Sequence, residues 1–556
     1  MGGPGRVKVV ELVRDAKLVD DLRRFFPHAE TRPYQAALAN QLYDELTTTK
    51  NVVVEAPTGL GKTSAVWAAV KAYAEEKRLR ILWLTRTASQ VRQVASETSA
   101  TPVYGRKLLC LHEVISKIDQ RRFNQACRAT RQAGRCPYYP GRPRAMKVVT
   151  IGDLKSAGAK TITCPYEIQL LNLSASTALV ATHRQLALVG WLLAKWRWSR
   201  EKTILVLDEG QHIVQEALSM IRDSIPLKTV AKAASEAEKY GFRELANMLR
   251  EAVEYYGSLL NSDGEIEVED RLPDYEEMVV AGEEIQEKKL RENYAPASHV
   301  LSLADFKASL AKSKPLLVRE GKSIRLEAIA DPQEVLQRIY SGWARTVTLS
   351  ATISAELLEA VLGEEVTLLR AGWPYGDNLK AMVVTGLTTK YEKRDEKMIE
   401  DIRWLLALAT RKGERALVFL PSFDILEAVK GENVLYEDRA LSQEAVDGLI
   451  SEFSSGNKPL VAVYNGRLGE GIDLSAPLVF LVGVPFSPPT ARTNKLLRRL
   501  SEIIGDEVKA KLYGVILPGL WSALQAAGRA IRGPEDSANV YLIDDRYRPL
   551  ARFLPR

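Results

Sequence analysis

The chain has 556 residues, of which 46% are hydrophobic and 26% are charged, as in ordinary globular proteins. At ~150 residues per domain, this length predicts about three to four domains. The longest apolar runs fall short of the ~18 residues that span a bilayer, and the N-terminal residues predict no secretory signal. We therefore expect a cytoplasmic protein that does not enter a membrane.

The net charge of +7 is unevenly distributed along the chain. Residues 105–164 contain 13 Lys and Arg against 3 Asp and Glu, whereas residues 215–340 contain 17 against 24. A compact basic segment favours a polyanion such as nucleic acid, and the alternative interpretation is a solvated basic surface.

The first half of the chain alternates predicted strands and helices. Residues 51–55 (NVVVE) predict a buried strand, followed by a glycine-rich loop and a helix over residues 64–76. This alternation is typical of a parallel, doubly wound α/β sheet. Two segments interrupt it, a cysteine-containing segment and an acidic, helical stretch over about residues 215–340. Further buried strands are predicted at residues 80–85, 177–181, 203–207 and 346–349.

A second strand–helix alternation begins near residue 380, after a Pro- and Gly-containing linker at residues 372–378. It contains no second glycine-rich loop of the same type, so we expect an α/β domain that completes the site formed by the first. The acidic residues 263–277 predict a loop. Strands are predicted at residues 381–385, 416–420, 460–464, 479–484 and 539–543.

Residues 56–63 (APTGLGKT) fit the phosphate-binding pattern G-x-x-x-x-G-K-[ST], with Ala56 in place of the first glycine. The backbone N–H groups of such a loop cradle phosphates, Lys62 reaches the terminal phosphates and the Thr63 hydroxyl holds Mg²⁺. Because the loop follows a strand and opens a helix, it favours an ATP site over a structural glycine turn. The predicted nucleotide-binding residues of the loop are Thr58, Gly59, Gly61, Lys62 and Thr63.

Asp208 and Glu209 directly follow the predicted strand at residues 203–207. We expect Asp208 to bind Mg²⁺ and Glu209 to orient and deprotonate the attacking water, although carboxylates at this position also cap helices. Arg529 and Arg532 share one face of a predicted helix. They predict arginine fingers that reach the γ-phosphate, and the alternative is a surface salt-bridge face.

All four cysteines lie within one segment, at Cys110, Cys127, Cys136 and Cys164. Their small number in a long chain argues against a disulfide scaffold, and chance would scatter four free thiols along the chain. Four thiolates suit either an iron–sulfur cluster or zinc, and His112 leaves a mixed zinc site open.

Basic and aromatic residues surround these cysteines. Six arginines could grip phosphates, and three tyrosines could either stack on bases or pack the small domain. The arginines are Arg106, Arg121, Arg122, Arg128, Arg131 and Arg135, and the tyrosines are Tyr138, Tyr139 and Tyr166.

Taken together, the order and spacing of these motifs resemble an XPD-type helicase of superfamily 2, over most of the chain. In that family the segment corresponding to Gln35 contacts the adenine side, and Arg86-Thr87 begins the motif that touches the DNA backbone. Residues 350–352 (SAT) resemble the motif that couples hydrolysis to domain movement. The other matching segments are Asp208-Glu209, residues 419–423, residues 466–473 and residues 525–532, in which Gln525 is expected at the nucleotide.

The resemblance implies two RecA-like motor domains, the first interrupted by a 4Fe–4S domain on the four cysteines and by a mainly helical arch. It places motor domain 1 at residues 1–104, 166–214 and 341–372, the cluster domain at 105–165, the arch at 215–340 and motor domain 2 at 373–556. One departure is Gln211, where the family has histidine.

The resemblance also implies the activity. We expect a monomeric, nucleoid-associated, ATP- and Mg²⁺-dependent helicase that moves 5′→3′ on single-stranded DNA and unwinds forked duplexes in DNA repair, with repair proteins as partners. The alternatives are a DinG-like helicase acting on R-loops and a DNA-stimulated ATPase that remodels proteins on DNA. A nuclease is disfavoured because no carboxylate-rich nuclease module is evident.

Overall fold

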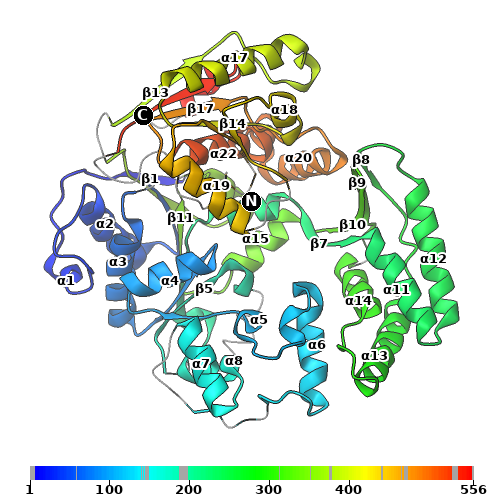
Figure 1. The fold of residues 1–556 in the computed structure, drawn as a ribbon. Coiled ribbons are helices and arrows are strands. Elements are labelled where there is room, and N and C mark those ends of the chain that lie inside the picture. Colours follow the sequence, from blue (N-terminus) through cyan, green and yellow to red (C-terminus); the bar gives the residue numbers. More distant parts are fainter. Residues whose placement is uncertain are drawn as a thin grey trace. The chain divides into compact units, whose positions relative to one another are not determined.

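A computed structural model describes residues 7–553, apart from the gaps given at the end of this paragraph. The chain divides into two compact units, shown as a ribbon in Figure 1. The first unit contains residues 1–72, 348–488 and 497–556, and the second contains residues 73–347 and 489–496. The gaps are residues 58, 140, 142, 145–149, 174, 187–197, 312, 351, 375–377, 440–442, 465, 467, 469–473 and 529–535.

In the first unit, parallel strands support the glycine-rich loop. Strand β12 (Val366–Arg370) pairs with β1 (Lys8–Glu11) on one side and with β2 (Asn51–Glu55) on the other. Val52, Val53 and Val54 are all buried, as expected for a parallel sheet that is covered on both faces. Beyond β2 the backbone N–H of Ala56 donates to the carbonyl of Ser350, the last residue of β11 (Arg345–Ser350). The nearby helices are α2 (Gln35–Thr48), α3 (Lys62–Lys77) and α16 (Ala355–Leu362).

The first unit also contains a six-stranded parallel sheet in the order β13-β18-β17-β14-β16-β15. Alternate residues of its central strands face two different cores, because successive side chains of a strand point to opposite faces. Helices α19 (Gln443–Ser455) and α22 (Leu517–Ala527) cover one face, and α17 (Glu396–Lys412) and α18 (Phe423–Ala428) cover the other. The strands are Leu379–Val384, Ala538–Ile543, Leu478–Val482, Ala416–Leu420, Leu460–Val463 and Leu435–Tyr436, in sheet order. The second strand–helix alternation therefore forms a parallel α/β sheet, as predicted.

The second unit begins with a parallel sheet in the order β6-β3-β5-β4. Strand β6 (Thr203–Leu207) is buried along its whole length, and Trp83 of β3 (Arg80–Thr85) is completely buried. The other two strands are β5 (Ala178–Thr182) and β4 (Thr101–Pro102). Helix α4 (Ala88–Glu97) follows β3 and begins with a capping box between Thr87 and Gln90.

The cysteine-containing segment folds into short helices around its own small core. In α6, Phe123, Ala126 and Thr130 are buried at helical spacing. Cys110 and Cys127 pack against this core, together with Ile118. The helices are α5 (Arg106–Leu109), α6 (Gln120–Gln132), α7 (Ile151–Thr161) and α8 (Pro165–Leu173).

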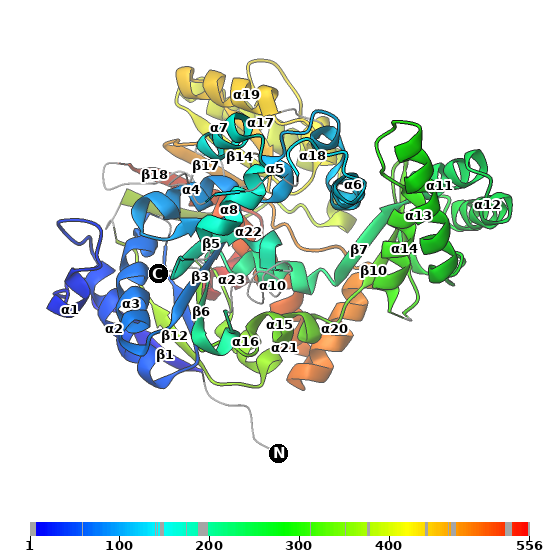
Figure 2. The same cartoon turned by 90° about the horizontal axis from the view of Figure 1, so that it is seen from below.

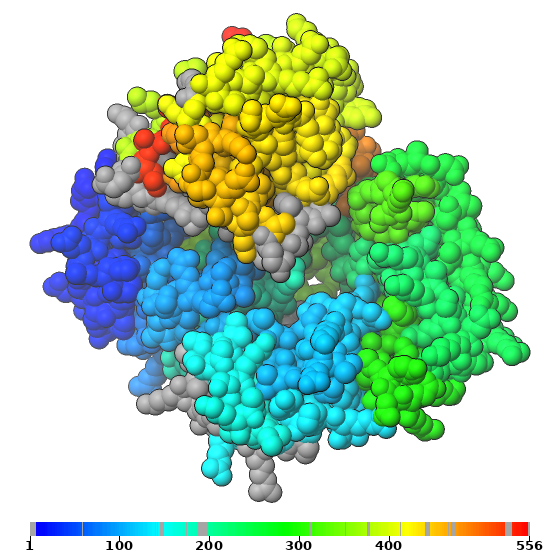
Figure 3. Space-filling model, in the orientation of Figure 1, coloured from blue at the N-terminus to red at the C-terminus, as the bar shows by residue number. Residues whose placement is uncertain are grey.

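The acidic stretch folds into a helical module, defined here as residues 221–329. Its four helices share one apolar core and lie side by side in Figures 1 and 2, and Figure 3 shows them as the green surface. The sequence predicted a mainly helical insertion, but the module also contains an antiparallel sheet in the order β7-β10-β9-β8. Residues 263–277, which were predicted to form a loop, contribute strand β8 to this sheet. The elements are β7 (Ile221–Pro226), α11 (Leu227–Lys239), α12 (Arg243–Ser258), β8 (Gly264–Glu267), α13 (Tyr275–Arg291), α14 (His299–Leu310), β9 (Leu316–Glu320) and β10 (Ser323–Ile329).

The remaining helices connect these parts. No helix in the described residues is long and apolar enough to cross a bilayer. Leu512–Ile516 form a π-helix that leads into α22. The remaining α-helices are α1 (Asp20–Arg23), α10 (Gln211–Leu218), α15 (Pro332–Tyr340), α20 (Ala491–Ile504), α21 (Glu507–Lys511) and α23 (Tyr547–Leu550).

A buried carboxylate ties residues 489–496 to the helical module. Glu327 of β10 is 1% exposed and accepts hydrogen bonds from Arg325 at 2.7 Å and from Arg492 at 2.5 Å. Arg492 also pairs with Glu265 at 3.0 Å. A buried carboxylate is costly unless cations compensate it, so both arginines are needed here.

We expect Arg492→Met to destabilise the module by about 1–3 kcal/mol, because Glu327 keeps only one of its two cationic partners. Hydrogen exchange of β7, β9 and β10 measures this local loss. The double variant Arg492→Met/Glu327→Met should recover most of the protection, since it removes the buried charge together with its partner. Equal exchange in the wild type and in Arg492→Met would contradict the anchoring role.

Candidate functional site

The glycine-rich loop has the backbone that a phosphate cradle requires. Gly59 and Gly61 have φ values of 83° and 79°, a region that favours glycine. Lys62 opens α3, and its Nζ donates to the carbonyls of Ala56 and Pro57 at 2.9 and 3.0 Å. The Lys62 ammonium is thus held over the loop, and Thr63 follows it in the first turn of the helix. Thr58 lies outside the described residues.

Gln35, at the start of α2, forms hydrogen bonds with this loop through its side chain. Its side chain is 3% exposed, and its Nε2 donates to the carbonyls of Leu60 and Gly61 at 2.9 and 3.1 Å. Its Oε1 accepts from the backbone N–H of Arg32 at 2.8 Å. A Cβ at position 61 would overlap Nε2 of Gln35, which is a second reason for glycine there. In this structure the amide of Gln35 therefore positions the loop, and its contact with adenine stays a prediction.

The acidic pair follows β6 in the second unit. The backbone N–H of Asp208 donates to the carbonyl of Leu84 in the neighbouring strand at 2.8 Å. Glu209 has a φ of 53°, an unfavourable conformation for a side chain of its size that the surrounding structure must impose. Nε2 of Gln90 donates to Oε1 of its carboxylate at 3.2 Å, and Nε2 of His212 lies 3.1 Å from Oε2.

His212 is a site residue that the sequence reasoning missed. The same Nε2 that faces Glu209 lies 3.2 Å from Nη1 of Arg86. A protonated Nε2 donates to Glu209, whereas a bare Nε2 accepts from Arg86, so the two bonds exclude each other. The sequence does place a histidine four residues after Asp208. It directly follows Gln211, the position that departs from the family pattern.

His183 was also missed, because it has no sequence motif. Its Nε2 lies 2.8 Å from the carbonyl oxygen of Asp208, and since that oxygen only accepts, Nε2 is the donor. Burial lowers the pKa of His183 to about 4, so the ring is neutral at pH 7. The neutral imidazole fixes the backbone at which the acidic pair leaves the sheet.

Gln211 points away from solvent and is 4% exposed. Its Oε1 has no hydrogen-bond partner within the part of the chain that the structure describes. Within those residues the Oε1 of Gln211 therefore makes no hydrogen bond, and it is His212 that contacts Glu209.

The expected coupling residues meet inside the first unit. Nε2 of Gln525 donates to the Thr352 hydroxyl at 3.4 Å, and Ser350 Oγ accepts from the backbone N–H of Thr352 at 2.9 Å. Gln525 thus contacts the motif at residues 350–352, and its predicted contact with the nucleotide stays a prediction. Arg529 and Arg532, the predicted arginine fingers, lie outside the described residues, as does most of the segment 466–473.

The four cysteines are half-buried and form no disulfide. Burial is the main cause that raises the pKa of the Cys110 thiol to about 11, and smaller contributions come from each of the other three thiols. The backbone N–H of Cys164 donates to the carbonyl of Tyr138 at 2.8 Å. Within the described residues, no group of three or more His, Cys, Asp or Glu side chains is arranged to hold a metal ion. Four thiols are suitable donors for an iron–sulfur cluster. Among the described residues, however, they are not arranged as a metal site.

Several arginines that were predicted to grip phosphates bind protein groups instead. Arg121 donates to Asp223 at 2.8 Å, and Arg135 bonds Asn293 at 3.1 Å. Arg106 lies 4.3 Å from the centroid of the Tyr166 ring, and Tyr166 is 5% exposed. Stacking of Tyr166 on a base is therefore wrong, because its ring is packed inside the segment. Arg131 lies 5.1 Å from the centroid of the Tyr139 ring.

Three family models match the chain. The model described as DEAD_2 matches residues 83–230, the helicase C-terminal domain matches residues 405–554, and the type III restriction enzyme res subunit matches residues 28–129. The chain is 23% identical to the ATP-dependent DNA helicase XPD of Sulfolobus acidocaldarius, over 93% of this chain and 96% of that protein. Over most of its length the chain is thus similar to XPD-like superfamily 2 DNA helicases.

Other relatives agree with this assignment. The chain is 22% identical to the ATP-dependent DNA helicase CHL1 of Yarrowia lipolytica, over 85% of this chain and 75% of that protein. Among solved structures, an XPD helicase matches with a TM-score of 0.73 and 20% identity, over 94% of this chain and 97% of that one. S. tokodaii Xpd4 matches with a TM-score of 0.62 and 17% identity, over 94% and 97% of the two chains. These structures support an α/β fold that resembles two RecA-like domains.

We expect His212→Asn to lower kcat for ATP hydrolysis about 10-fold with little change in KM, because Glu209 loses a hydrogen bond worth ~1.5 kcal/mol. Steady-state hydrolysis measured over a range of ATP concentrations checks this, because it separates kcat from KM. His112→Asn, in the cysteine-containing segment, is the matched control and should leave the rate unchanged. An unaltered kcat in His212→Asn would contradict the positioning role.

Proposed function

We propose that this helicase hydrolyses ATP to move 5′→3′ along single-stranded DNA and to unwind forked duplexes, in the service of DNA repair. The observation that carries the ATPase step is the Glu209 carboxylate, which is held at a strained turn after a buried strand and is contacted by Gln90 and His212. The DNA substrate is supported by the activity named for the XPD and CHL1 relatives.

In the proposed reaction, Lys62 and the loop N–H groups bind the β- and γ-phosphates, and Thr63 and Asp208 hold Mg²⁺. Mg²⁺ neutralises the charge that develops on the phosphates. Glu209 orients the attacking water and accepts its proton, while Arg529 and Arg532 stabilise the transferring phosphoryl group. Thr352 and Gln525 transmit the change, because their side chains already contact each other.

We further propose that Cys110, Cys127, Cys136 and Cys164 bind a 4Fe–4S cluster, and that the residues of the helical module serve as the arch. Such a cluster supplies four iron–thiolate bonds that cross-link the segment. The residues of this chain support it in two ways: the four thiols are half-buried without disulfides, and the Cys110 thiol interacts electrostatically with the other three. The cluster would keep helices α5, α6 and α8 in fixed positions beside the DNA.

A second candidate is a DNA-stimulated ATPase that remodels protein–DNA complexes without separating strands. Its support is Gln211, whose buried Oε1 has no partner in the described part of the chain and which stands where the family has histidine. If ATP hydrolysis were only weakly coupled to domain movement, the protein could move along DNA but could not separate base pairs.

Strand displacement on matched duplexes with a 5′ or a 3′ single-stranded tail separates these two candidates. We expect release from the 5′-tailed duplex only, with ATP and Mg²⁺, and no release by Lys62→Ala. Release from the 3′-tailed duplex would contradict the direction. ATP hydrolysis that is stimulated by single strands, with no release from either duplex, would favour the remodelling ATPase.

Replacing Cys110 by serine should abolish strand displacement and sharply lower the iron and acid-labile sulfide per chain, while nucleotide binding is retained. Metal analysis of anaerobically purified protein checks this. His112→Ala is the control: it should keep its iron, whereas a mixed zinc site would lose zinc in this variant. Normal unwinding by Cys110→Ser would show that the segment acts without a cluster.

A further inference from the structure

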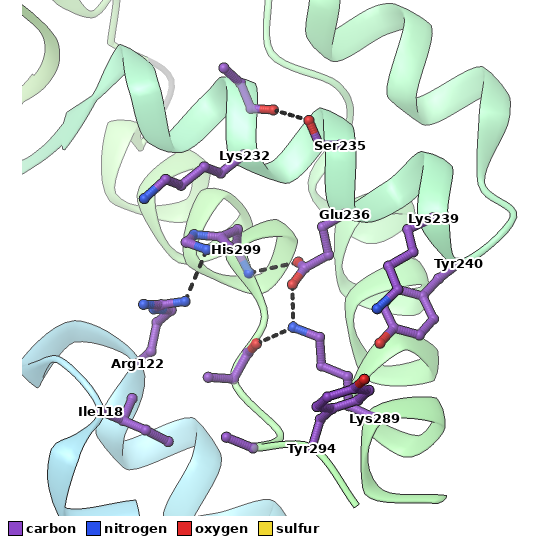
Figure 4. A pocket seen from close by; sticks show the side chains of 13 residues that line it. Ile118, Arg122, Lys232, Ser235, Glu236, Lys239, Tyr240, Lys289, Tyr294 and His299 are labelled. Atoms are coloured by element: carbon purple, nitrogen blue, oxygen red, sulfur yellow. Dashed lines mark hydrogen bonds and ion pairs between the residues drawn. The ribbon is translucent and has the colours of Figure 1, made fainter. Parts of the chain in front are cut away.

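A cavity of about 700 Å³ lies within the second unit, where α6 of the cysteine-containing segment meets α11, α13 and α14 of the helical module. Figure 4 shows its lining from close by. The volume is in the range of sites for small organic ligands and exceeds what a single inorganic anion fills. None of its lining residues belongs to the ATP-binding motifs.

The cavity is strongly cationic, although the module around it is acidic overall. Four cationic side chains line it, and Glu236 is the single carboxylate among the described lining residues. Glu236 is already neutralised: it accepts from Lys289 at 2.5 Å and from the backbone N–H of His299 at 2.7 Å. The cations are Arg122, Lys232, Lys239 and Lys289.

Two of these cations have no carboxylate partner. Neither Lys232 nor Lys239 forms an ion pair with any residue that the structure describes, and both are exposed on α11. Arg122 is held differently, since its Nε donates to Asp119 at 2.6 Å and its Nη1 to Nε2 of His299 at 3.0 Å. In Figure 4, His299 lies between the Arg122 and Lys232 side chains.

His299 does not add a further charge at neutral pH. Burial and the neighbouring Arg122, Lys289 and Lys232 lower its pKa, whereas Glu236 acts in the opposite direction. Because a guanidinium N–H can only donate, Nε2 of His299 accepts from Arg122, and the single proton of the neutral ring lies on Nδ1. The ring thus orients a fixed cation toward the cavity.

Two aromatic rings form the other side of the lining. Nζ of Lys239 lies 5.1 Å from the centroid of Tyr240 and 5.0 Å from that of Tyr294. Tyr240 is 8% exposed and is fixed by a hydrogen bond from its hydroxyl to Glu292, whereas Tyr294 is 59% exposed. An exposed tyrosine beside unpaired lysines offers a surface for an aromatic base next to a site for phosphate.

We propose that this cavity binds a free nucleoside monophosphate. Lys232, Lys239 and Arg122 contact the phosphate, and Tyr294 stacks on the base. The site is separate from the glycine-rich loop, and the inference does not depend on ATP hydrolysis or on the proposed direction of movement.

Photocrosslinking of the full chain tests this with two probes. One is 4-thiothymidine 5′-monophosphate, and the other is a strand of about four nucleotides that carries the same base. Neither probe contains a triphosphate, and the adducts are located by peptide mapping. We expect adducts on the peptides that contain Tyr240 or Tyr294. An adduct with the free nucleotide supports the inference, whereas adducts with the strand alone contradict it.

The variant Lys232→Ala/Lys239→Ala should lower the adduct yield about 10-fold at a probe concentration below saturation, which corresponds to ~1.4 kcal/mol of binding free energy. The matched control is Lys228→Ala/Lys322→Ala, which removes two exposed lysines of the same module that do not line the cavity. This control should keep the wild-type yield. Circular dichroism of both variants establishes that they are folded.

Three results would overturn the inference. The first is the absence of free-nucleotide adducts on both tyrosine peptides, whether or not the strand forms them. The second is an undiminished yield in Lys232→Ala/Lys239→Ala. The third is an equal loss in the control variant, which would show attraction to the net charge of the module and no defined site.

Discussion

The proposed chemistry depends on one backbone turn, where β6 ends and Glu209 takes up a φ of 53°. A side chain in this conformation costs of order 1–3 kcal/mol, so other contacts must impose it. The strand bond from Asp208 to Leu84 and the hydrogen bond from the neutral His183 hold the residue before it. Both of these hydrogen bonds involve the main chain, and the carboxylate of Glu209 contacts Gln90 and His212.

In the second unit, several charged side chains pair with other groups of the protein. Arg325 and Arg492 compensate the buried Glu327, and Arg121 reaches from the cysteine-containing segment to Asp223 and the carbonyl of Ser224. Arg121, which was expected to grip phosphates, is therefore used within the protein. The unpaired lysines lie instead on α11, inside a module whose net charge is negative, because folding sorts charges by helix face and not by segment.

The sequence predicted most of the strands to within two residues, since buried parallel strands form continuous apolar runs. It also located the glycine-rich loop and the acidic pair, whose spacing carries their chemistry. It could not locate His183 or His212, because their roles depend on distances to Asp208 and Glu209 that only the fold creates. The small sheet of the helical module was missed for a similar reason: β8 consists of Gly264–Glu267, and its pairing with β9 is set by residues about fifty positions away.

His212 changes how hydrolysis could be sensed in this chain. Its Nε2 either donates to Glu209 or accepts from Arg86, and one proton decides between the two. If Glu209 acts as proposed and takes a proton from water, it has less need of a donor, and the bond from Arg86 to His212 is then favoured. Arg86 begins the segment that resembles the DNA-contacting motif, so the imidazole of His212 would link the proposed catalytic carboxylate to that motif. Gln211 is buried, and its Oε1 has no partner within the described residues.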